Sequence, residues 1–260
     1  MDHRVDIVDG ALLRIAGPED APTLLLLHAF ADTGYAYAGL FASDALKSYR
    51  LVAVDLWGFG ASPRRADVRT VDDYAKALGN LINAHLTDRS IGLVGHSIAG
   101  TMAVAVANRL GDKVTGVFSI EGNLTPDDAF FTGRAKDYDD PDLFKRDFLD
   151  QVWQLGQESP ALRQYYAGAV LADARTMWDL GNDAVRISDG DRLGQLHRAL
   201  ARPSLYYWST ESTPAATRDW IENSDIAHEV YTGAGHWPMV EQPEETARAI
   251  GRFFDRILAG

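Results

Sequence analysis

Ser97 is the residue of this sequence best placed to act as a nucleophile. It lies at the centre of the stretch LVGHSIAGTM, between an apolar run and an alanine-rich run. A serine on a sharp turn between a strand and a helix needs small residues two positions away on either side, and Gly95 and Ala99 meet that need. The N–H group of Ile98, at the start of the helix, is then available to a developing oxyanion. A serine that only caps the helix is the simpler alternative.

The composition excludes several other kinds of chemistry. The 260 residues include no cysteine, so thiolate catalysis, disulfides and cysteine-bound zinc are ruled out. A formal net charge of −12 argues against nucleic acid or an anionic membrane as the main partner, since both need a basic face. Neither a metal-ligand cluster nor a G-x-G-x-x-G stretch after a predicted strand occurs in the sequence. No metal and no cofactor are therefore expected.

The N-terminus and the apolar runs indicate a cytoplasmic protein. The stretch MDHRVDIVDG is charged from its second residue and lacks the apolar segment of a signal peptide. No apolar run approaches the roughly 18 residues needed to span a bilayer. A small-molecule substrate is the expected partner, and the sequence is compatible with a monomer or a homodimer.

Strands and helices alternate along most of the chain. Continuous apolar stretches predict buried strands, and apolar residues at helical spacing predict amphipathic helices. The predicted strands are an antiparallel pair at 4–8 and 11–17, followed by 23–28, 49–55, 91–96, 114–121, 204–209 and 227–232. The predicted helices are 71–86, 98–110 and 243–258. The alternation predicts an α/β fold with a mostly parallel central sheet flanked by helices.

The alternation breaks once, between Glu121 and Pro203. Roughly 80 residues pass there without a convincing strand, far more than an ordinary connection needs. The composition of this stretch predicts helices at 140–156, 159–181 and 189–201. We expect residues 122–202 to form a helical cap, or lid, over the nucleophile. The α/β core would then consist of residues 1–121 and 203–260.

Four motifs in a fixed order resemble those of the α/β-hydrolase superfamily, and the resemblance covers nearly the whole chain outside the cap. LLLLHAFADTG resembles the loop after the third strand, with Ala29 where glycine is usual. VDLWGFGAS resembles the D-x-x-G-x-G-x-S turn after the fourth strand. The serine turn is the third motif, and GAGHWPMVEQPEE resembles the histidine loop before the last helix. The resemblance implies an α/β-hydrolase fold with a serine, histidine and acid triad.

The resemblance also implies roles for individual residues. His236 is the general base, and its Gly-Ala-Gly loop suits an imidazole that is presented into a cleft. The backbone N–H groups of Phe30 and Ile98 form the oxyanion hole. His96 and His28 are expected mainly to orient the serine turn and the oxyanion loop.

Substrate contacts are expected from a few side chains around the triad. Those assigned to substrate binding are His28, Trp153, Trp178 and Trp237. The cap aromatics Phe130, Phe131, Tyr165 and Tyr166 have spacing suited to helix packing, and some are expected to roof an apolar pocket. Asp55 is expected to be structural, and Asp32 follows the oxyanion loop.

Two glutamates compete for the place of the triad acid. The family most often carries its aspartate after the strand at 204–209, where this chain has Ser212, with Glu211 one residue away. Some branches place the acid after the strand that follows the serine helix, where this chain has Glu121. A carboxylate at the end of a buried strand needs a partner, because an unpaired buried charge is costly. We favour Glu121, which would hold the tautomer of His236 and stabilise its imidazolium form.

The predicted activity is hydrolysis of a carboxylic ester or lactone with an apolar portion, through an acyl intermediate on Ser97 and without a cofactor. Three other classes stay open on the same scaffold: carbon–carbon bond hydrolases, cofactor-independent dioxygenases and hydrolase-like ligand receptors. The dioxygenases resemble this chain in placing the acid after the same strand. Oxygen uptake would separate them from the rest, and ligand-dependent binding of a partner would indicate a receptor.

Overall fold

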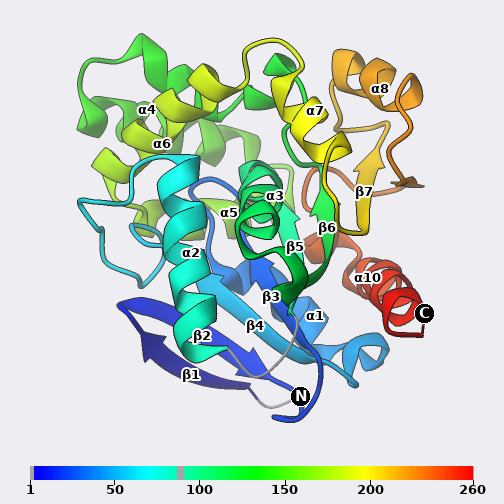
Figure 1. Cartoon of the computed structure of the whole chain (residues 1–260). Coiled ribbons are helices and arrows are strands. Elements are labelled where there is room, and N and C mark those ends of the chain that lie inside the picture. Colours follow the sequence, from blue (N-terminus) through cyan, green and yellow to red (C-terminus); the bar gives the residue numbers. More distant parts are fainter. Residues whose placement is uncertain (1–2, 87–90, 260) are drawn as a thin grey trace.

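The computed structural model describes residues 3–86 and 91–259, which form an eight-stranded sheet with helices around it (Figure 1). The strand order is β1-β2-β4-β3-β5-β6-β7-β8. Strand β2 pairs antiparallel with β1 and with β4, and all other pairings are parallel. The strands are β1 His3–Val8, β2 Ala11–Ala16, β3 Thr23–Leu27, β4 Arg50–Asp55, β5 Ile91–His96, β6 Val114–Ile120, β7 Ser204–Ser209 and β8 His228–Tyr231. The predicted mostly parallel sheet is confirmed.

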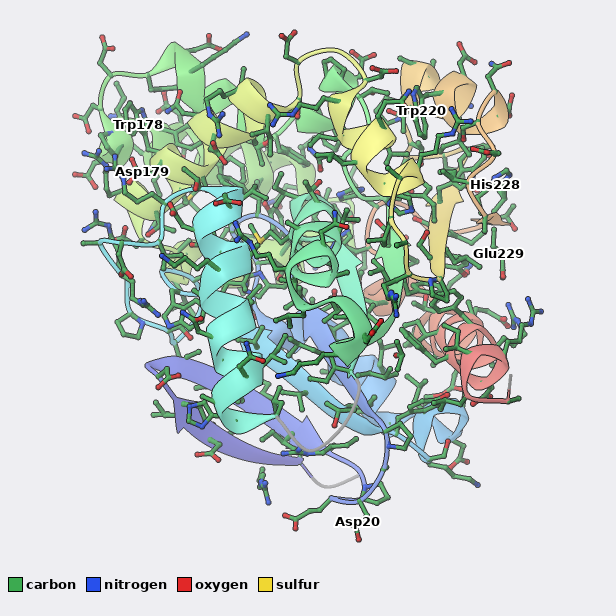
Figure 2. The ribbon with its side chains drawn as sticks, in the orientation of Figure 1. Asp20, Trp178, Asp179, Trp220, His228 and Glu229 are labelled. Atoms are coloured by element: carbon green, nitrogen blue, oxygen red, sulfur yellow. The ribbon has the colours of Figure 1, made fainter. Side chains whose placement is uncertain are left out.

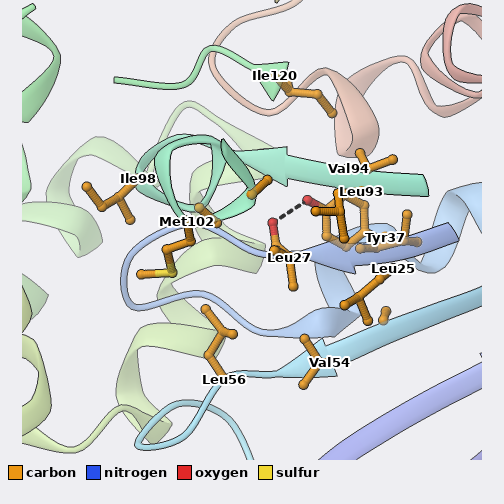
Figure 3. Close-up of a cluster of buried hydrophobic side chains, with 14 of the residues drawn as sticks. Leu25, Leu27, Tyr37, Val54, Leu56, Leu93, Val94, Ile98, Met102 and Ile120 are labelled. Atoms are coloured by element: carbon orange, nitrogen blue, oxygen red, sulfur yellow. Dashed lines mark hydrogen bonds between the residues drawn. The ribbon is translucent and has the colours of Figure 1, made fainter. Parts of the chain in front are cut away.

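Strands β3 and β5 form the middle of the sheet, and every residue of both is buried. Their continuous apolar sequences suit strands that are covered on both faces. Figure 3 shows part of the resulting core, to which Leu27 of β3, Val94 of β5, Ile98 and Met102 all belong. Tyr37 is fully buried beside them and donates a hydrogen bond from its hydroxyl to the Leu27 carbonyl at 2.7 Å.

Helices cover the sheet. Figure 1 shows α2 and α3 in front of the strands, where they pack against each other. Helix α10 packs closely against β5. A Cβ added to Gly92 of β5 would lie 2.5 Å from the ring of Phe254 in α10. The α-helices outside the β6–β7 connection are α1 Ala38–Ala42, α2 Val71–His85, α3 Ile98–Leu110, α8 Ala215–Glu222, α9 Pro238–Glu241 and α10 Pro243–Ala259. Short 3-10 helices are η1 Gly34–Tyr37, η2 Asp44–Leu46 and η3 Gly111–Lys113.

The chain between β6 and β7 forms helices and no strand. Figure 1 shows α4 and α6 of this segment beyond the end of the sheet toward which β6 and β7 point. Its helices are η4 Pro126–Ala129, η5 Thr132–Asp137, α4 Pro141–Leu155, α5 Pro160–Leu171, α6 Ala174–Ile187 and α7 Arg192–Arg198. None of the helices in the described ranges 3–86 and 91–259 is long and apolar enough to cross a membrane.

The single helix predicted over 159–181 is wrong, because the chain breaks it into α5 and α6. Asp173 causes the break: its carboxylate accepts a hydrogen bond from the Thr176 N–H at 2.8 Å and so begins α6. The Asp173 N–H donates to the Gly58 carbonyl at 2.8 Å instead of continuing α5. An N-cap aspartate is a strong helix-start signal, and here it outweighs the apolar periodicity that runs across it.

Candidate active site

Ser97 occupies a strained turn between β5 and α3. Its φ and ψ angles are 56° and −131°, a region that non-glycine residues rarely adopt. The turn is fixed on both sides, because the Ser97 N–H donates to the Ile120 carbonyl at 2.9 Å and the Ser97 carbonyl accepts from Gly100 N–H at 2.7 Å. Gly95 has no room for a side chain, since a Cβ there would lie 2.3 Å from the Ala99 carbonyl oxygen. The small neighbours predicted around Ser97 are therefore a packing requirement.

Glu121 and His236 are directly hydrogen-bonded to each other. Glu121 Oε2 lies 2.6 Å from His236 Nδ1, although the residues are 115 positions apart. Glu121 follows the last residue of β6, and His236 lies in the loop between β8 and α9. Because the carboxylate accepts, Nδ1 carries the proton and Nε2 is left as the basic ring nitrogen.

The second oxygen of Glu121 is held by three donors. Oε1 accepts hydrogen bonds from the Tyr231 hydroxyl at 2.6 Å, from the Ser209 N–H at 3.2 Å and from the Ser212 hydroxyl. Burial raises the pKa of Glu121, but the hydrogen bonds from His236, Ser212 and Tyr231 bring it below its usual value. The carboxylate is therefore ionised at neutral pH despite being buried.

Glu211, the alternative acid, contacts the histidine loop and not the histidine ring. Its exposed carboxylate accepts a hydrogen bond from the Gly233 N–H at 2.9 Å. Glu241 holds the same loop by accepting from the Gly235 N–H at 2.7 Å. Of the two predicted candidates, the structure brings only Glu121 to His236.

The loop after β3, which carries Phe30, is fixed by His28 and Tyr165. His28 is fully buried, and its Nε2 accepts from the Leu56 N–H at 2.9 Å, so its Nδ1 donates to the Ala29 carbonyl at 2.7 Å. Tyr165 of α5 donates its hydroxyl hydrogen bond to the Phe30 carbonyl at 2.7 Å. These bonds leave the Phe30 backbone in one orientation beside the serine turn.

A small, partly open cavity joins these elements. It encloses about 10 Å³ and is lined by Ala29, Phe30, Ser97, Asp128, Phe130, Phe131, Thr132, Tyr165, His236 and Trp237. Ser97 and His236 thus face the same space. Four of the lining residues belong to the segment between β6 and β7: Asp128, Phe130, Phe131 and Thr132. A volume of this size leaves room for no more than about one water molecule.

Asp32 and His96 support the cavity from behind. Asp32 is buried, and its carboxylate accepts hydrogen bonds from Trp237 Nε1–H at 3.2 Å and from the Thr33 N–H at 2.8 Å. Burial raises the pKa of Asp32 to about 7. His96 is also buried, which lowers its pKa well below the usual value, and its Nε2 donates to the His236 carbonyl at 2.7 Å. Both residues therefore hold the histidine loop in place.

Three of the predicted substrate contacts do not line the cavity. His28 is occupied by two backbone hydrogen bonds, as described above. Trp153 is exposed and its ring packs on Tyr166 at 5.2 Å. Trp178 donates from its indole N–H to the Tyr138 carbonyl at 2.7 Å, and Figure 2 shows it at the outer edge of the inserted helices. Trp237 alone of the four lines the cavity.

Sequence reasoning missed Tyr231 and the supporting role of Ser212. The available signal was topological: parallel strands β6, β7 and β8 end at the same edge of the sheet, so residues at their ends meet. Asp55, expected to be structural, is buried and forms an ion pair with Arg14 at 2.5 Å. Among the described residues, no group of three or more histidines, aspartates or glutamates could hold a metal ion.

The comparisons with known proteins agree with this architecture. Residues 24–249 match the sequence model of a family described as the Alpha/beta hydrolase family. An uncharacterized protein of Mycobacterium tuberculosis is 25% identical to this chain, with 93% of this chain and 77% of that protein covered.

Two solved structures are similar along nearly the whole chain. A putative aryl esterase from Burkholderia cenocepacia has a TM-score of 0.75 at 21% identity and covers 100% of both chains. An N-acyl homoserine lactonase complexed with N-hexanoyl homoserine has a TM-score of 0.79 at 15% identity, covering 98% of this chain and 97% of that one. At these identities the likeness shows a shared fold.

Proposed function

Because this chain belongs to the alpha/beta hydrolase family, we propose that it is a serine hydrolase that cleaves a carboxylic ester or lactone. The contact between Glu121 Oε2 and His236 Nδ1, beside a cavity that Ser97 also lines, carries the proposal. An ionised carboxylate, an imidazole oriented by it and a serine hydroxyl are the parts that acyl transfer needs.

The proposed reaction has two halves. In the first, Ser97 Oγ attacks the acyl carbon while His236 Nε2 takes its proton, and the proton then passes to the leaving alcohol oxygen. In the second, His236 Nε2 takes a proton from water as the water attacks the acyl-serine carbon. The bond from that carbon to Ser97 Oγ then breaks, His236 returns the proton to Ser97 Oγ, and the carboxylic acid is released. Glu121 remains ionised throughout and stabilises the imidazolium form of His236.

The oxyanion of each tetrahedral intermediate would be bound by the N–H groups of Phe30 and Ile98. Ile98 is the first residue of α3, so its N–H has no acceptor within the helix and lies at the positive end of the helix dipole. The Phe30 backbone is held by the bond from Tyr165 to its carbonyl. Donors fixed in advance stabilise developing charge without reorganisation.

The cavity favours an uncharged, partly apolar substrate. Five aromatic side chains line it, and no lysine or arginine does. Its volume of about 10 Å³ is too small for any ester, so substrate entry requires movement of the segment that carries Phe130 and Phe131. We propose that residues 122–202 act as a cap over Ser97, with the α/β core formed by residues 1–121 and 203–260.

The test is a panel of p-nitrophenyl esters and lactones of increasing acyl length, assayed with the wild type and with Ser97→Ala. We expect turnover of uncharged medium-length substrates that the variant loses, with a burst of p-nitrophenol equal to the enzyme concentration where deacylation is slow. Wild-type turnover unaffected by Ser97→Ala would contradict an acyl-serine mechanism.

A cofactor-independent dioxygenase is the second candidate, and the position of Glu121 after β6 favours it. In that reaction His236 would deprotonate an organic substrate, which then reacts with molecular oxygen. Oxygen consumption separates the two candidates, because ester hydrolysis consumes none.

A further inference from the structure

We propose that a second cavity, between α3, α6 and α7, binds a medium-chain carboxylate that carries a hydrogen-bonding oxygen at its far end. This α3–α7 cavity encloses about 560 Å³, which lies within the usual range of small-molecule sites. It shares no lining residue with the cavity of Ser97. Figure 1 shows α7 above α3, and the two helices are in contact.

Apolar atoms make up the larger part of the exposed wall area of the α3–α7 cavity. Val104 and Ala105 of α3 face it from one side, and Leu193 and Leu196 of α7 face it from the other. Ile187 at the end of α6, Leu124 and Val71 of α2 also line it. Leu196 is 43% exposed, so an occupant would also cover apolar surface that now contacts water. An alkyl chain fits such a wall.

Three polar side chains that line this cavity lack hydrogen-bond partners. Ser119 Oγ, His197 Nε2 and both polar side-chain atoms of Asn123 are unpaired among the described residues. Each of the three residues is no more than 3% exposed. Buried polar groups are nearly always paired in native proteins, and leaving one unpaired is costly. An oxygen that can donate and accept would provide a partner.

The charged side chains that line the α3–α7 cavity favour an anion at the other end of the ligand. Asp72 is paired with Arg109, and Asp183 with Arg186 at 2.5 Å. Arg192, the first residue of α7, lines the cavity and is exposed, and no carboxylate of the described chain forms an ion pair with it. The cavity therefore has one uncompensated positive charge in a protein whose net charge is −12. Guanidinium groups bind carboxylates through paired hydrogen bonds.

The experiment is isothermal titration calorimetry of the full chain with octanoate and with 8-hydroxyoctanoate. We expect 8-hydroxyoctanoate to bind about 3- to 10-fold more tightly, because one added hydrogen bond to a buried group has that effect. Arg192→Gln should weaken both ligands about tenfold. Arg198→Gln is the matched control: it removes the same charge from the same helix, but Arg198 bonds to Asp225 and does not line the cavity. It should leave both affinities unchanged.

Ala105→Trp tests the location independently by filling the cavity from α3. We expect it to abolish binding while thermal unfolding stays cooperative. Absence of binding to the wild type, or equal binding to wild type and Arg192→Gln, would overturn the proposal. Equal affinities for octanoate and 8-hydroxyoctanoate would contradict the pairing with Ser119, Asn123 and His197. The substituted residues do not line the Ser97 cavity. If the ligands bound in the Ser97 cavity instead, the wild type and all the variants would therefore have the same affinity.

Discussion

Ser212 donates a hydrogen bond from its hydroxyl to Glu121 Oε1, across 91 positions of sequence. On the family resemblance, Ser212 stands after β7 where the triad carboxylate is most often found. In this chain the carboxylate that contacts His236 comes from Glu121 at the end of β6, and Ser212 donates a hydrogen bond to it. One oxygen of Glu121 is thereby fixed by Ser212 and Tyr231, and the other faces His236.

This division of the two oxygens predicts the effect of Glu121→Gln. The amide keeps the shape of the side chain but loses the charge that stabilises the imidazolium and can present an N–H to His236 Nδ1. We expect kcat to fall by about 10⁴ with little change in the unfolding temperature. The measurement is kcat on the best ester of the panel.

Glu211→Gln is the matched control for this substitution. The new amide oxygen can still accept the hydrogen bond of the Gly233 N–H, so the loop should stay in place. We expect kcat within a factor of about three of the wild-type value. A loss in Glu211→Gln with near-normal turnover in Glu121→Gln would reverse the assignment of the acid.

Ser97→Ala should lower kcat by about 10⁶, because the members of a catalytic triad act as a unit. The half-buried hydroxyl is not part of the core, so the variant should unfold at nearly the wild-type temperature. Single-turnover kinetics check the result and expose contamination by a second esterase. If the loss were below tenfold, base catalysis by His236 without an acyl intermediate would be the better explanation.

Sequence alone predicted the parts of this protein that depend on local pattern. The continuous apolar strands, the antiparallel N-terminal pair and the small residues around Ser97 are each specified within a few neighbouring positions. The end of β6 was predicted to within one residue, at Glu121 where the strand ends at Ile120, because an acidic residue closes the apolar run. The contact between Glu121 and His236 then follows from parallel strands ending at one edge.

The supporting residues could not be predicted, because their partners are far away in sequence. Trp237 reaches Asp32 across 205 positions and Tyr231 reaches Glu121 across 110. Nothing in the immediate neighbourhood of either residue indicates such a bond. Trp153 and Trp178 do not line the cavity of Ser97, and helical spacing alone does not reveal which side of a helix faces that cavity.

Tyr231→Phe should move the acidic limb of the pH profile of kcat/KM to higher pH. The hydroxyl of Tyr231 is one of the donors that keep the pKa of Glu121 below its usual value against the effect of burial. Without it the carboxylate takes up a proton at a higher pH, and the active ionised form is lost earlier as pH falls. A hydrogen bond to a charged group is worth about one pH unit or more.

Tyr207→Phe is the control for that profile. The Tyr207 ring packs on Tyr231 at 4.6 Å, but its hydroxyl is not among the described donors to Glu121. We expect its acidic limb to coincide with that of the wild type. A uniform loss of activity in Tyr231→Phe, with no shift of the limb, would mean that Tyr231 acts only through packing and through its bond to the Gly235 carbonyl.

The raised pKa of Asp32 predicts how the free energy of unfolding depends on pH. Burial raises its pKa from 3.8 to about 7, so between these values the folded protein holds a proton that the unfolded chain has released. The free energy of unfolding should therefore fall as pH rises from about 4 to about 7 and stay constant above, with a contribution of about 4 kcal/mol at most. Asp32→Asn cannot titrate and should lack this contribution.

The comparison of wild type with Asp32→Asn isolates this group, because every other titration is common to both proteins. Urea unfolding at intervals of half a pH unit from about 4 to about 8 gives the two free energies. The amide places one N–H against either Trp237 Nε1–H or the Thr33 N–H, so the variant should be the less stable protein at pH 4. As pH rises, the advantage of the wild type should shrink and level off near pH 7. A difference that stays constant, or that grows with pH, would show that Asp32 is ionised in the folded protein throughout this range.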